Sequence, residues 1–286
     1  MRTLLVTGAS GQLGSELRML ASIDKTYDFL FKDSSDLDIT DERCLKILIN
    51  SRKIDAIINC AAYTAVDKAE SDKDRANAVN HLAVLNLGKI AKDYAIQLIH
   101  ISSDYVFDGK NYKPYDENDD PNPQTVYGRT KLNGELALRK INPPRSAIIR
   151  TSWLHSVFNT NFVKTILALG KTRDELKIVG DQIGSPTHAK DLAEVILNIL
   201  PNLTGNTTDV FHFSNEGICS WYDLAAAIFE FKKIQCKLEP ISSSQYPTAA
   251  PRPHYSVLST NKIKTELNIE ILHWRQALCE VLTRLK

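Results

Sequence analysis

The sequence of 286 residues is poor in cysteine and methionine, and it contains no long basic run and no long apolar run. Its five cysteines are scattered and form no C-x-x-C pair, so we expect reduced, structural thiols. No apolar stretch approaches ~18 residues, and the apolar start from Met1 to Thr7 reaches glycine too soon for a signal peptide. These absences predict a cytoplasmic protein.

The sequence also has no excess of charge of either sign. Lysine and arginine number 35 against 34 aspartate and glutamate, which gives a net charge of +1. A protein that binds nucleic acid usually carries a basic patch or stripe, and this sequence shows neither. We therefore expect a small-molecule partner rather than a nucleic acid or a membrane.

What is present is an alternation of apolar runs and helix-like segments. This alternation predicts an α/β fold, a Rossmann-type doubly wound parallel sheet with a smaller, interleaved C-terminal lobe. We place a dinucleotide-binding domain at residues 1–150 and a mainly substrate-binding lobe at 151–286, some segments of which return to the first domain. The expected strands are 2–7, 27–31, 55–61, 97–102 and 146–151. The expected helices include 75–94, 161–169, 190–200, 221–232 and 274–285, and the proline-rich segment 108–125 is expected to be a loop.

A glycine-rich turn follows the first expected strand. Gly8, Gly11 and Gly14 are spaced G-x-x-G-x-x-G and open a helix, which is the context that a phosphate-binding turn requires. A tight structural turn without a ligand is the alternative. At the end of the second strand, Lys32 could meet a 2′-phosphate whereas Asp33 could reject one, so we expect NADPH with some use of NADH. Lys32 could equally be a solvated strand end.

Tyr127 and Lys131 are four residues apart, so on a helix they share one face. We expect the ammonium to lower the pKa of the phenol from its ordinary value near ~10, so that the tyrosine exchanges a proton near neutral pH. Ser103 ends an expected central strand at the edge where open α/β sheets bind ligands, and its hydroxyl could bond a substrate carbonyl oxygen. Together these three residues suggest a carbonyl reductase, although Y-x-x-x-K alone is a weak motif.

Longer blocks of sequence resemble those of the dTDP-4-dehydrorhamnose reductase family, in the extended short-chain dehydrogenase/reductase superfamily, over nearly the full length. The blocks are Thr7 to Gly14, Leu37 to Asp41, Cys60 to Glu70, Ser102 to Gly109, Tyr127 to Lys131, Arg150 to Trp153, Asn161 to Val163, Asp181 to Thr187, and Arg252-Pro253 with Ser256 and Leu258. The Ala-Ala-Tyr-Thr, Asp-Tyr-Val-Phe, Arg-Thr-Ser-Trp and Asp-Gln-x-Gly-x-Pro-Thr blocks are more diagnostic than the glycine turn.

The resemblance implies reduction of the 4-keto group of dTDP-4-dehydro-L-rhamnose by NADPH or NADH, with hydride coming from the nicotinamide and Tyr127 donating the proton. It implies a catalytic trio of Ser103, Tyr127 and Lys131. The implied cofactor contacts are Gly8, Ser10, Gly11, Gln12, Leu13, Gly14, Asp38, Ile39, Ala61, Ala62, Tyr63, Tyr127 and Lys131, to which the residues themselves add Lys32. The implied substrate contacts are Thr64, Val66, Ser103, Asp104, Tyr105, Trp153, Asn161 and Arg252.

Two of these substrate assignments have structural alternatives. The indole face of Trp153 suits a deoxysugar ring, but a tryptophan here could also be a core residue. Arg252 suits a diphosphate, but it follows two prolines closely and could be a surface loop cation. His81 and His100 are expected to be structural.

Some members of the family bind magnesium at a subunit contact. Glu16 matches one acidic position of that kind, but Lys190 stands about where another would be, so we expect no required metal. A homodimer is possible. Two other functions stay open, namely a reductase of another nucleotide-linked 4-ketosugar and a non-catalytic dinucleotide-binding regulatory subunit. An epimerase that retains NAD is a weaker third.

Overall fold

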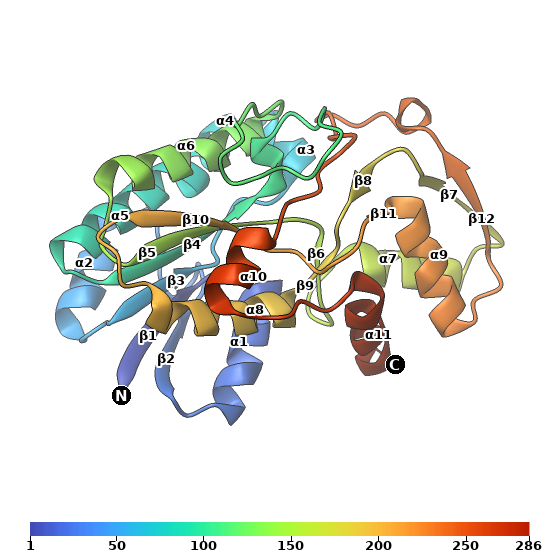
Figure 1. The fold of residues 1–286 in the computed structure, drawn as a ribbon. Coiled ribbons are helices and arrows are strands. Elements are labelled where there is room, and N and C mark those ends of the chain that lie inside the picture. Colours follow the sequence, from blue (N-terminus) through green and yellow to red (C-terminus); the bar gives the residue numbers. More distant parts are fainter. Residues whose placement is uncertain (286) are drawn as a thin grey trace.

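The structure, a computed structural model, describes residues 1–285. A six-stranded parallel sheet forms its larger part, with strands in the order β10-β5-β4-β3-β1-β2 (Figure 1). The strands are β1 (Arg2–Thr7), β2 (Tyr27–Lys32), β3 (Ala56–Asn59), β4 (Gln97–Ser103), β5 (Ser146–Thr151) and β10 (Thr208–His212). This arrangement confirms the predicted doubly wound α/β fold.

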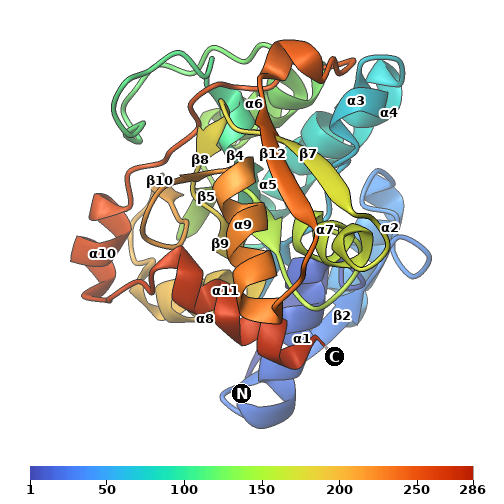
Figure 2. The same ribbon diagram turned by 90° about the vertical axis from the view of Figure 1, so that its right-hand side faces the viewer.

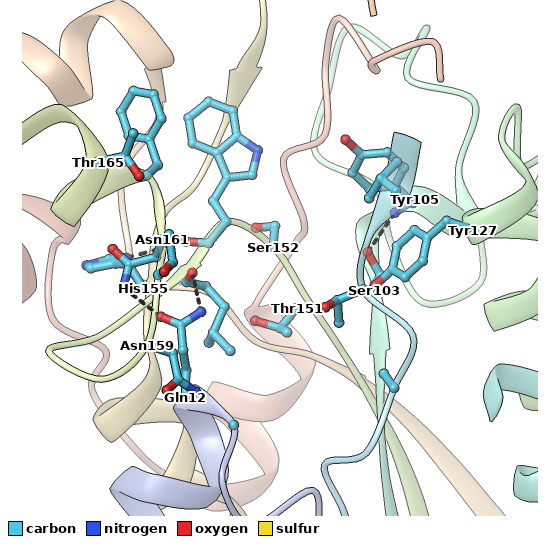
Figure 3. Close-up of a pocket in the computed structure, with 18 of the residues that line it drawn as sticks. Gln12, Ser103, Tyr105, Tyr127, Thr151, Ser152, His155, Asn159, Asn161 and Thr165 are labelled. Atoms are coloured by element: carbon cyan, nitrogen blue, oxygen red, sulfur yellow. Dashed lines mark hydrogen bonds between the residues drawn. The ribbon is translucent and has the colours of Figure 1, made fainter. Parts of the chain in front are cut away.

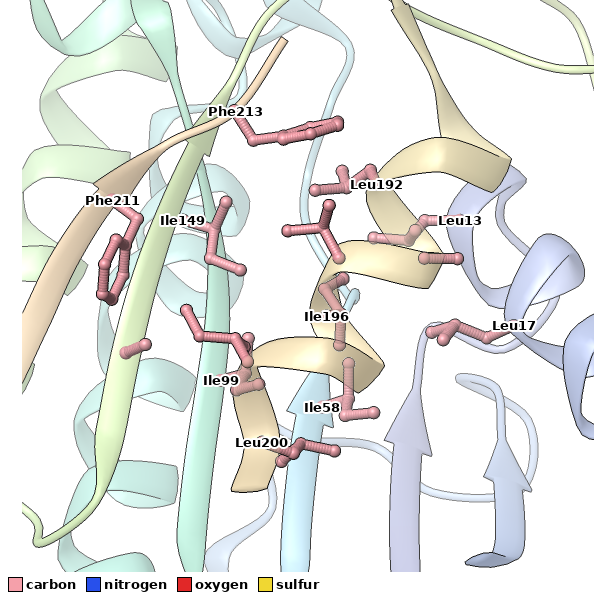
Figure 4. Packing of buried hydrophobic residues seen from close by; sticks show 14 of the residues in the cluster. Leu13, Leu17, Ile58, Ile99, Ile149, Leu192, Ile196, Leu200, Phe211 and Phe213 are labelled. Carbon is pink, nitrogen blue, oxygen red and sulfur yellow. The ribbon is translucent and has the colours of Figure 1, made fainter. Parts of the chain in front are cut away.

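Strands of this sheet are apolar on both faces because helices cover both. In β1, Leu4 and Val6 face one cluster while Leu5 faces the other, as the two-residue period of a strand requires. The first cluster packs the sheet against α1 (Gln12–Ile23) and α8 (Ala189–Ile199), through Leu13, Leu17, Leu192 and Ile196 (Figure 4). The second packs it against α2 (Glu42–Ser51), α5 (Ala83–Asp93) and α6 (Val126–Ile141).

A smaller lobe lies beyond the carboxyl ends of the strands, on the right of Figure 1 and toward the viewer in Figure 2. Its own apolar cluster joins helices to a two-stranded parallel sheet. Its elements are α7 (Phe162–Gly170), β7 (Glu175–Val179), α9 (Trp221–Lys232), β12 (Lys237–Ile241) and α11 (Trp274–Arg284). Two short pairs lie between the lobes, β6 (Leu154–His155) with β9 (Thr187–His188) and β8 (Ile183–Gly184) with β11 (Cys219–Ser220).

The chain crosses between the lobes more than once. After β5 it enters the smaller lobe, returns through α8 and β10 to the larger sheet, leaves again through α9, and comes back at α10 (Asn261–Leu267). Between residues 1 and 285, no helix is both long and apolar enough to cross a bilayer.

The expected helix at 75–94 is interrupted. It is divided into α4 (Lys73–Asn77), a π-helical turn at Ala78–Leu82 and α5, and a short α3 (Val66–Ala69) precedes them. The turn carries Asn80, whose side chain accepts from the backbone N–H of Tyr63 at 2.9 Å and donates to its carbonyl at 3.1 Å. Such turns often occur at functional sites, and this one fixes the chain that follows β3.

Candidate active site

One cavity of about 1620 Å³ runs between the two lobes, across the carboxyl ends of the strands. Both lobes contribute to its wall, and the predicted trio lies on the side of the larger lobe, with Ser103, Tyr105 and Tyr127 facing residues of the smaller lobe (Figure 3). All of the predicted site residues line this cavity except Lys32. A cavity at this edge is the usual ligand site of an open α/β sheet.

The glycine turn is shaped so that another backbone can approach it. Gly8 has a left-handed backbone, with φ of +65°, and a Cβ there would lie 2.6 Å from the backbone nitrogen of Ala61. Gly14 packs equally closely on Ala9. Helix α1 begins within this turn, at Gln12, and no side chain of the described residues caps its N-terminus. Its free N–H groups and the positive end of its dipole therefore fit a phosphate group.

The predicted contact of Lys32 with a 2′-phosphate stays a prediction. Lys32 contributes a backbone carbonyl that accepts from Ala9 N at 3.1 Å, but its side chain does not line the cavity. Asp33 does line it, and so does a cation that the sequence reasoning missed, Arg75 at the start of the interrupted helix. Asp38 lines the cavity too, and its pKa is lowered mainly by hydrogen bonds from the side chain and backbone of Thr40 and further by the charge of Arg75.

Ser103 ends β4 and its hydroxyl is buried. It donates to Asp104 Oδ1 at 2.8 Å and accepts from the backbone N–H of Tyr105 at 3.2 Å. Asp104 is buried as well, and desolvation raises the pKa of its carboxyl to about 6. Its other oxygen is buried and has no hydrogen-bond partner of good geometry among the described residues, although the buried Ser256 hydroxyl is close enough to lower the pKa of this carboxyl.

Tyr127 lies in the first turn of α6, which Thr125 caps by accepting from Gly128 N. The predicted lowering of its pKa is wrong. Burial raises the pKa of Tyr127 to about 12, and the Ser103 hydroxyl offsets only part of that rise. The phenol is therefore fully protonated at neutral pH, which is the form that a proton donor needs.

Among the described residues, Lys131 makes no hydrogen bond to the Tyr127 hydroxyl, and its charge does not offset the rise in the pKa of that phenol. Its ammonium is buried and donates to the carbonyl of Ile101 at 2.6 Å, with His100 Nε2 at 3.3 Å. Burial lowers the pKa of Lys131 to about 8. The i,i+4 spacing put both side chains on one face of the helix, but the long lysine extends past the tyrosine onto the sheet.

Trp153 lies across the cavity and has a left-handed backbone, with φ of +48°, which is rare for a bulky residue. Its indole stacks on Trp221, with ring centroids 3.5 Å apart and planes 5° apart. Trp221 in turn contacts Phe162. Trp153 is only partly buried and lines the cavity, so it is not a closed core residue. Because Trp221 covers one face, that face is not open to a sugar ring, and sequence reasoning missed this partner.

Asn161 and Arg252 both line the cavity, and both have protein partners. Asn161 caps α7 and donates to Gln12 Oε1 at 2.8 Å, which ties the glycine turn to the smaller lobe (Figure 3). Arg252 pairs with Asp67 at 2.5 Å, and its side chain is 21% exposed. An arginine that already has a carboxylate partner at a cavity wall can still present its remaining N–H groups to an anion.

The two positions considered for a metal, Glu16 and Lys190, are both engaged in ion pairs. Glu16 is buried and lies 3.3 Å from Arg284 Nη1. Lys190 lies 3.2 Å from Glu280 and 3.7 Å from Glu194. Within residues 1–285, the single group with the spacing of metal ligands is His188, Asp191 and Glu280, and the last of these already holds Lys190.

The model of a family described as RmlD substrate binding domain matches residues 1–286. This chain is similar to a dTDP-4-dehydrorhamnose reductase of Aggregatibacter actinomycetemcomitans, at 42% identity over 97% of each chain. It is also similar to the spore coat polysaccharide biosynthesis protein SpsK of Bacillus subtilis, at 40% identity over 99% of this chain and 97% of that one.

A solved structure gives the same likeness in three dimensions. It is the crystal structure of a dTDP-4-dehydrorhamnose reductase from Bacillus anthracis in complex with NADP, with a TM-score of 0.94 and 34% identity. The match covers 99% of this chain and 100% of that chain.

Proposed function

Because the chain belongs to the RmlD substrate binding domain family, we propose that it reduces the 4-keto group of dTDP-4-dehydro-L-rhamnose to give dTDP-L-rhamnose, with NADPH as reductant. One observation carries the proposal. Ser103, Tyr127 and Lys131 lie on the wall of the same cavity as the glycine turn, so a carbonyl and a dinucleotide can meet there. The protein is accordingly an NAD(P)H-dependent oxidoreductase.

The cavity fits a dinucleotide along the larger lobe. The close approach at Gly8, the uncapped start of α1 and the wall residues Asp38 and Ile39 suit a diphosphate and an adenine in that order. When bound, the nicotinamide supplies a hydride. Tyr127 would then give its phenolic proton to the sugar oxygen, and the Ser103 hydroxyl, whose hydrogen points at Asp104 in this structure, would turn to donate to that oxygen. Lys131 would hold the nicotinamide ribose.

The nucleotide sugar would lie between the two lobes. Thr64, Val66 and Tyr105 line the cavity beside the trio, and the exposed edge of Trp153 bounds it opposite them. Arg252 supplies a cation for the diphosphate.

The direct test is to follow NADPH oxidation at 340 nm with enzymatically prepared dTDP-4-dehydro-L-rhamnose and to identify the product sugar by NMR. Formation of dTDP-L-rhamnose is expected. A product of another configuration would reassign the substrate to a different 4-ketosugar nucleotide. Tight NADPH binding with no turnover on any such substrate would favour the regulatory function instead.

Arg75 makes the choice of cofactor testable. A guanidinium at the Asp38 end of the cavity can bond a 2′-phosphate, and a charge-assisted hydrogen bond contributes about 1.5–3 kcal/mol. We expect Arg75→Ala to raise KM for NADPH by roughly 10-fold and to leave KM for NADH within about 2-fold. Arg139→Ala, on the outer part of α6, is the control. An equal rise in KM for NADPH and NADH would contradict the proposed contact between Arg75 and the 2′-phosphate.

Metal removal should have no effect on turnover. Glu16 and Lys190, the positions considered for magnesium, are engaged in ion pairs with Arg284 and Glu280. We therefore expect full activity after dialysis against excess EDTA. Loss of activity that magnesium restores, with calcium as the comparison ion, would contradict this prediction.

A further inference from the structure

Three polar side chains form a row across neighbouring strands beneath the active site. Thr7 ends β1, Asn59 ends β3 and His100 lies in β4, and each is the register partner of the next across the sheet. All three are at most 1% exposed. Register partners in parallel strands point to the same face, and Lys131 from α6 meets the row at its His100 end.

The row is hydrogen-bonded throughout. The Thr7 hydroxyl donates to Asn59 Oδ1 at 2.7 Å, and Asn59 Nδ2 lies 3.0 Å from His100 Nδ1. His100 Nε2 lies 3.3 Å from Lys131 Nζ, which also donates to Ile101 O. Burying a row of polar groups costs free energy unless each group has a hydrogen-bond partner, and in this row each one does.

The direction of the hydrogen bonds along the row determines which imidazole nitrogen of His100 carries the proton. An amide whose oxygen accepts from Thr7 must present its NH₂ group to His100, so Nδ1 is an acceptor and the proton of the neutral ring is on Nε2. That N–H points at Lys131. Were the Asn59 amide turned over, the hydroxyl hydrogen of Thr7 would lose its acceptor, and Nε2 would become an acceptor for the lysine instead.

We propose that His100 is a positioning residue for Lys131, and that the Thr7 hydroxyl, acting through Asn59, fixes which imidazole nitrogen faces the lysine. An Nε2–H opposite Nζ favours the uncharged amine, which can accept that hydrogen while donating to Ile101 O. The row therefore holds Lys131 where it can gain and lose a proton near neutral pH. The assignment of Lys131 to catalysis rests on the proposed function, but the state of His100 does not.

The other titratable groups around Lys131 are His100 itself, Cys60, Glu135 and Tyr127, and none of them takes over the effect of the His100 N–H on the charge of Lys131. His100 is fully buried and its own pKa is held well below the ordinary value by desolvation, so it stays neutral. Cys60 has a pKa raised to about 12 by burial and also stays neutral. The Glu135 carboxylate, one turn further along α6 and paired with Arg150, raises the pKa of Lys131, but burial lowers that pKa by more. Tyr127, one turn earlier, is protonated at neutral pH.

The test uses Thr7→Val, which keeps the shape of the side chain and removes the donor. Proton–nitrogen NMR of protein labelled with ¹⁵N-histidine reports the tautomer, the His100 signals being identified by their loss in His100→Gln. We expect Nε2–H in the wild type and Nδ1–H in Thr7→Val. We also expect the pH at which NADPH affinity falls, as Lys131 loses its charge, to rise by about one unit in Thr7→Val.

Thr7→Ser retains the hydroxyl and should match the wild type in both measurements. Thr3→Val makes the same change on the same strand, at a side chain without a hydrogen bond, and should also match it. An Nδ1–H in the wild type, or a Thr7→Val protein with unchanged tautomer and unchanged pH profile, would overturn the proposal. If Thr7→Val does not fold, the wild-type spectrum alone still tests the proposal, because it shows which nitrogen of His100 carries the proton. Absence of ketosugar reduction would contradict the proposed function, but it would not change the tautomer measured for His100.

Discussion

Tyr127→Phe should lower kcat by about 100-fold or more while the Kd for NADPH stays within about 2-fold of the wild type. The substitution removes one oxygen and leaves the buried ring, including its edge-to-face contact with Tyr105 at 5.5 Å between centroids. Burial holds the pKa of the phenol at about 12, so the wild-type group is protonated throughout the neutral range. What the variant loses is therefore the proton donor alone.

Single-turnover and steady-state rates with dTDP-4-dehydro-L-rhamnose would measure the effect, and fluorescence titration would give the NADPH affinity. Tyr112→Phe makes the same change at a tyrosine that is 90% exposed, and it should behave as the wild type. Turnover by Tyr127→Phe within about 3-fold of the wild type would mean that another group, with Asp104 as the nearest buried acid, supplies the proton.

The larger sheet was predictable because its strands carry a strong local pattern. A parallel strand covered on both faces is apolar at nearly every position, so β1, β4 and β5 stand out in the sequence. The edge strand β10 was not predicted. Only Phe211 and His212 of its five residues are buried, and its pairing with β5 joins segments about sixty residues apart. Two-residue strands such as β6 and β8 carry no local pattern at all.

The candidate site was predictable where a residue type and its position in a turn or at a strand end carry the information. The glycine turn, Ser103 and Tyr127 all have such a local cause, and the structure brings them to one cavity. What Tyr127 and Lys131 do to each other was not predictable, because spacing on a helix gives a common face and not a side-chain path. The stack of Trp153 on Trp221 joins residues far apart in sequence, and no local pattern reports it.

A buried ion pair beneath α6 is the clearest case of a feature without a local pattern. Glu135 of α6 and Arg150 of β5 are each 1% exposed. Arg150 donates from Nη2 to Oε2 at 2.7 Å and from Nε to Oε1 at 3.0 Å, and the Ser102 hydroxyl also donates to this carboxylate. The pair anchors α6 to the sheet one turn beyond Lys131, so it fixes the element that carries Tyr127.

We expect Glu135→Ala to lower the free energy of unfolding by about 3–5 kcal/mol, because it leaves the Arg150 guanidinium buried without a counter-charge. Urea denaturation at pH 7 would measure this. Glu230→Ala, which breaks the exposed pair with Arg275, should cost under about 1 kcal/mol. Joint replacement by Glu135→Leu and Arg150→Met should recover most of the loss, since it removes both charges together. A cost below about 1 kcal/mol for Glu135→Ala would show that α6 is held by its apolar contacts alone.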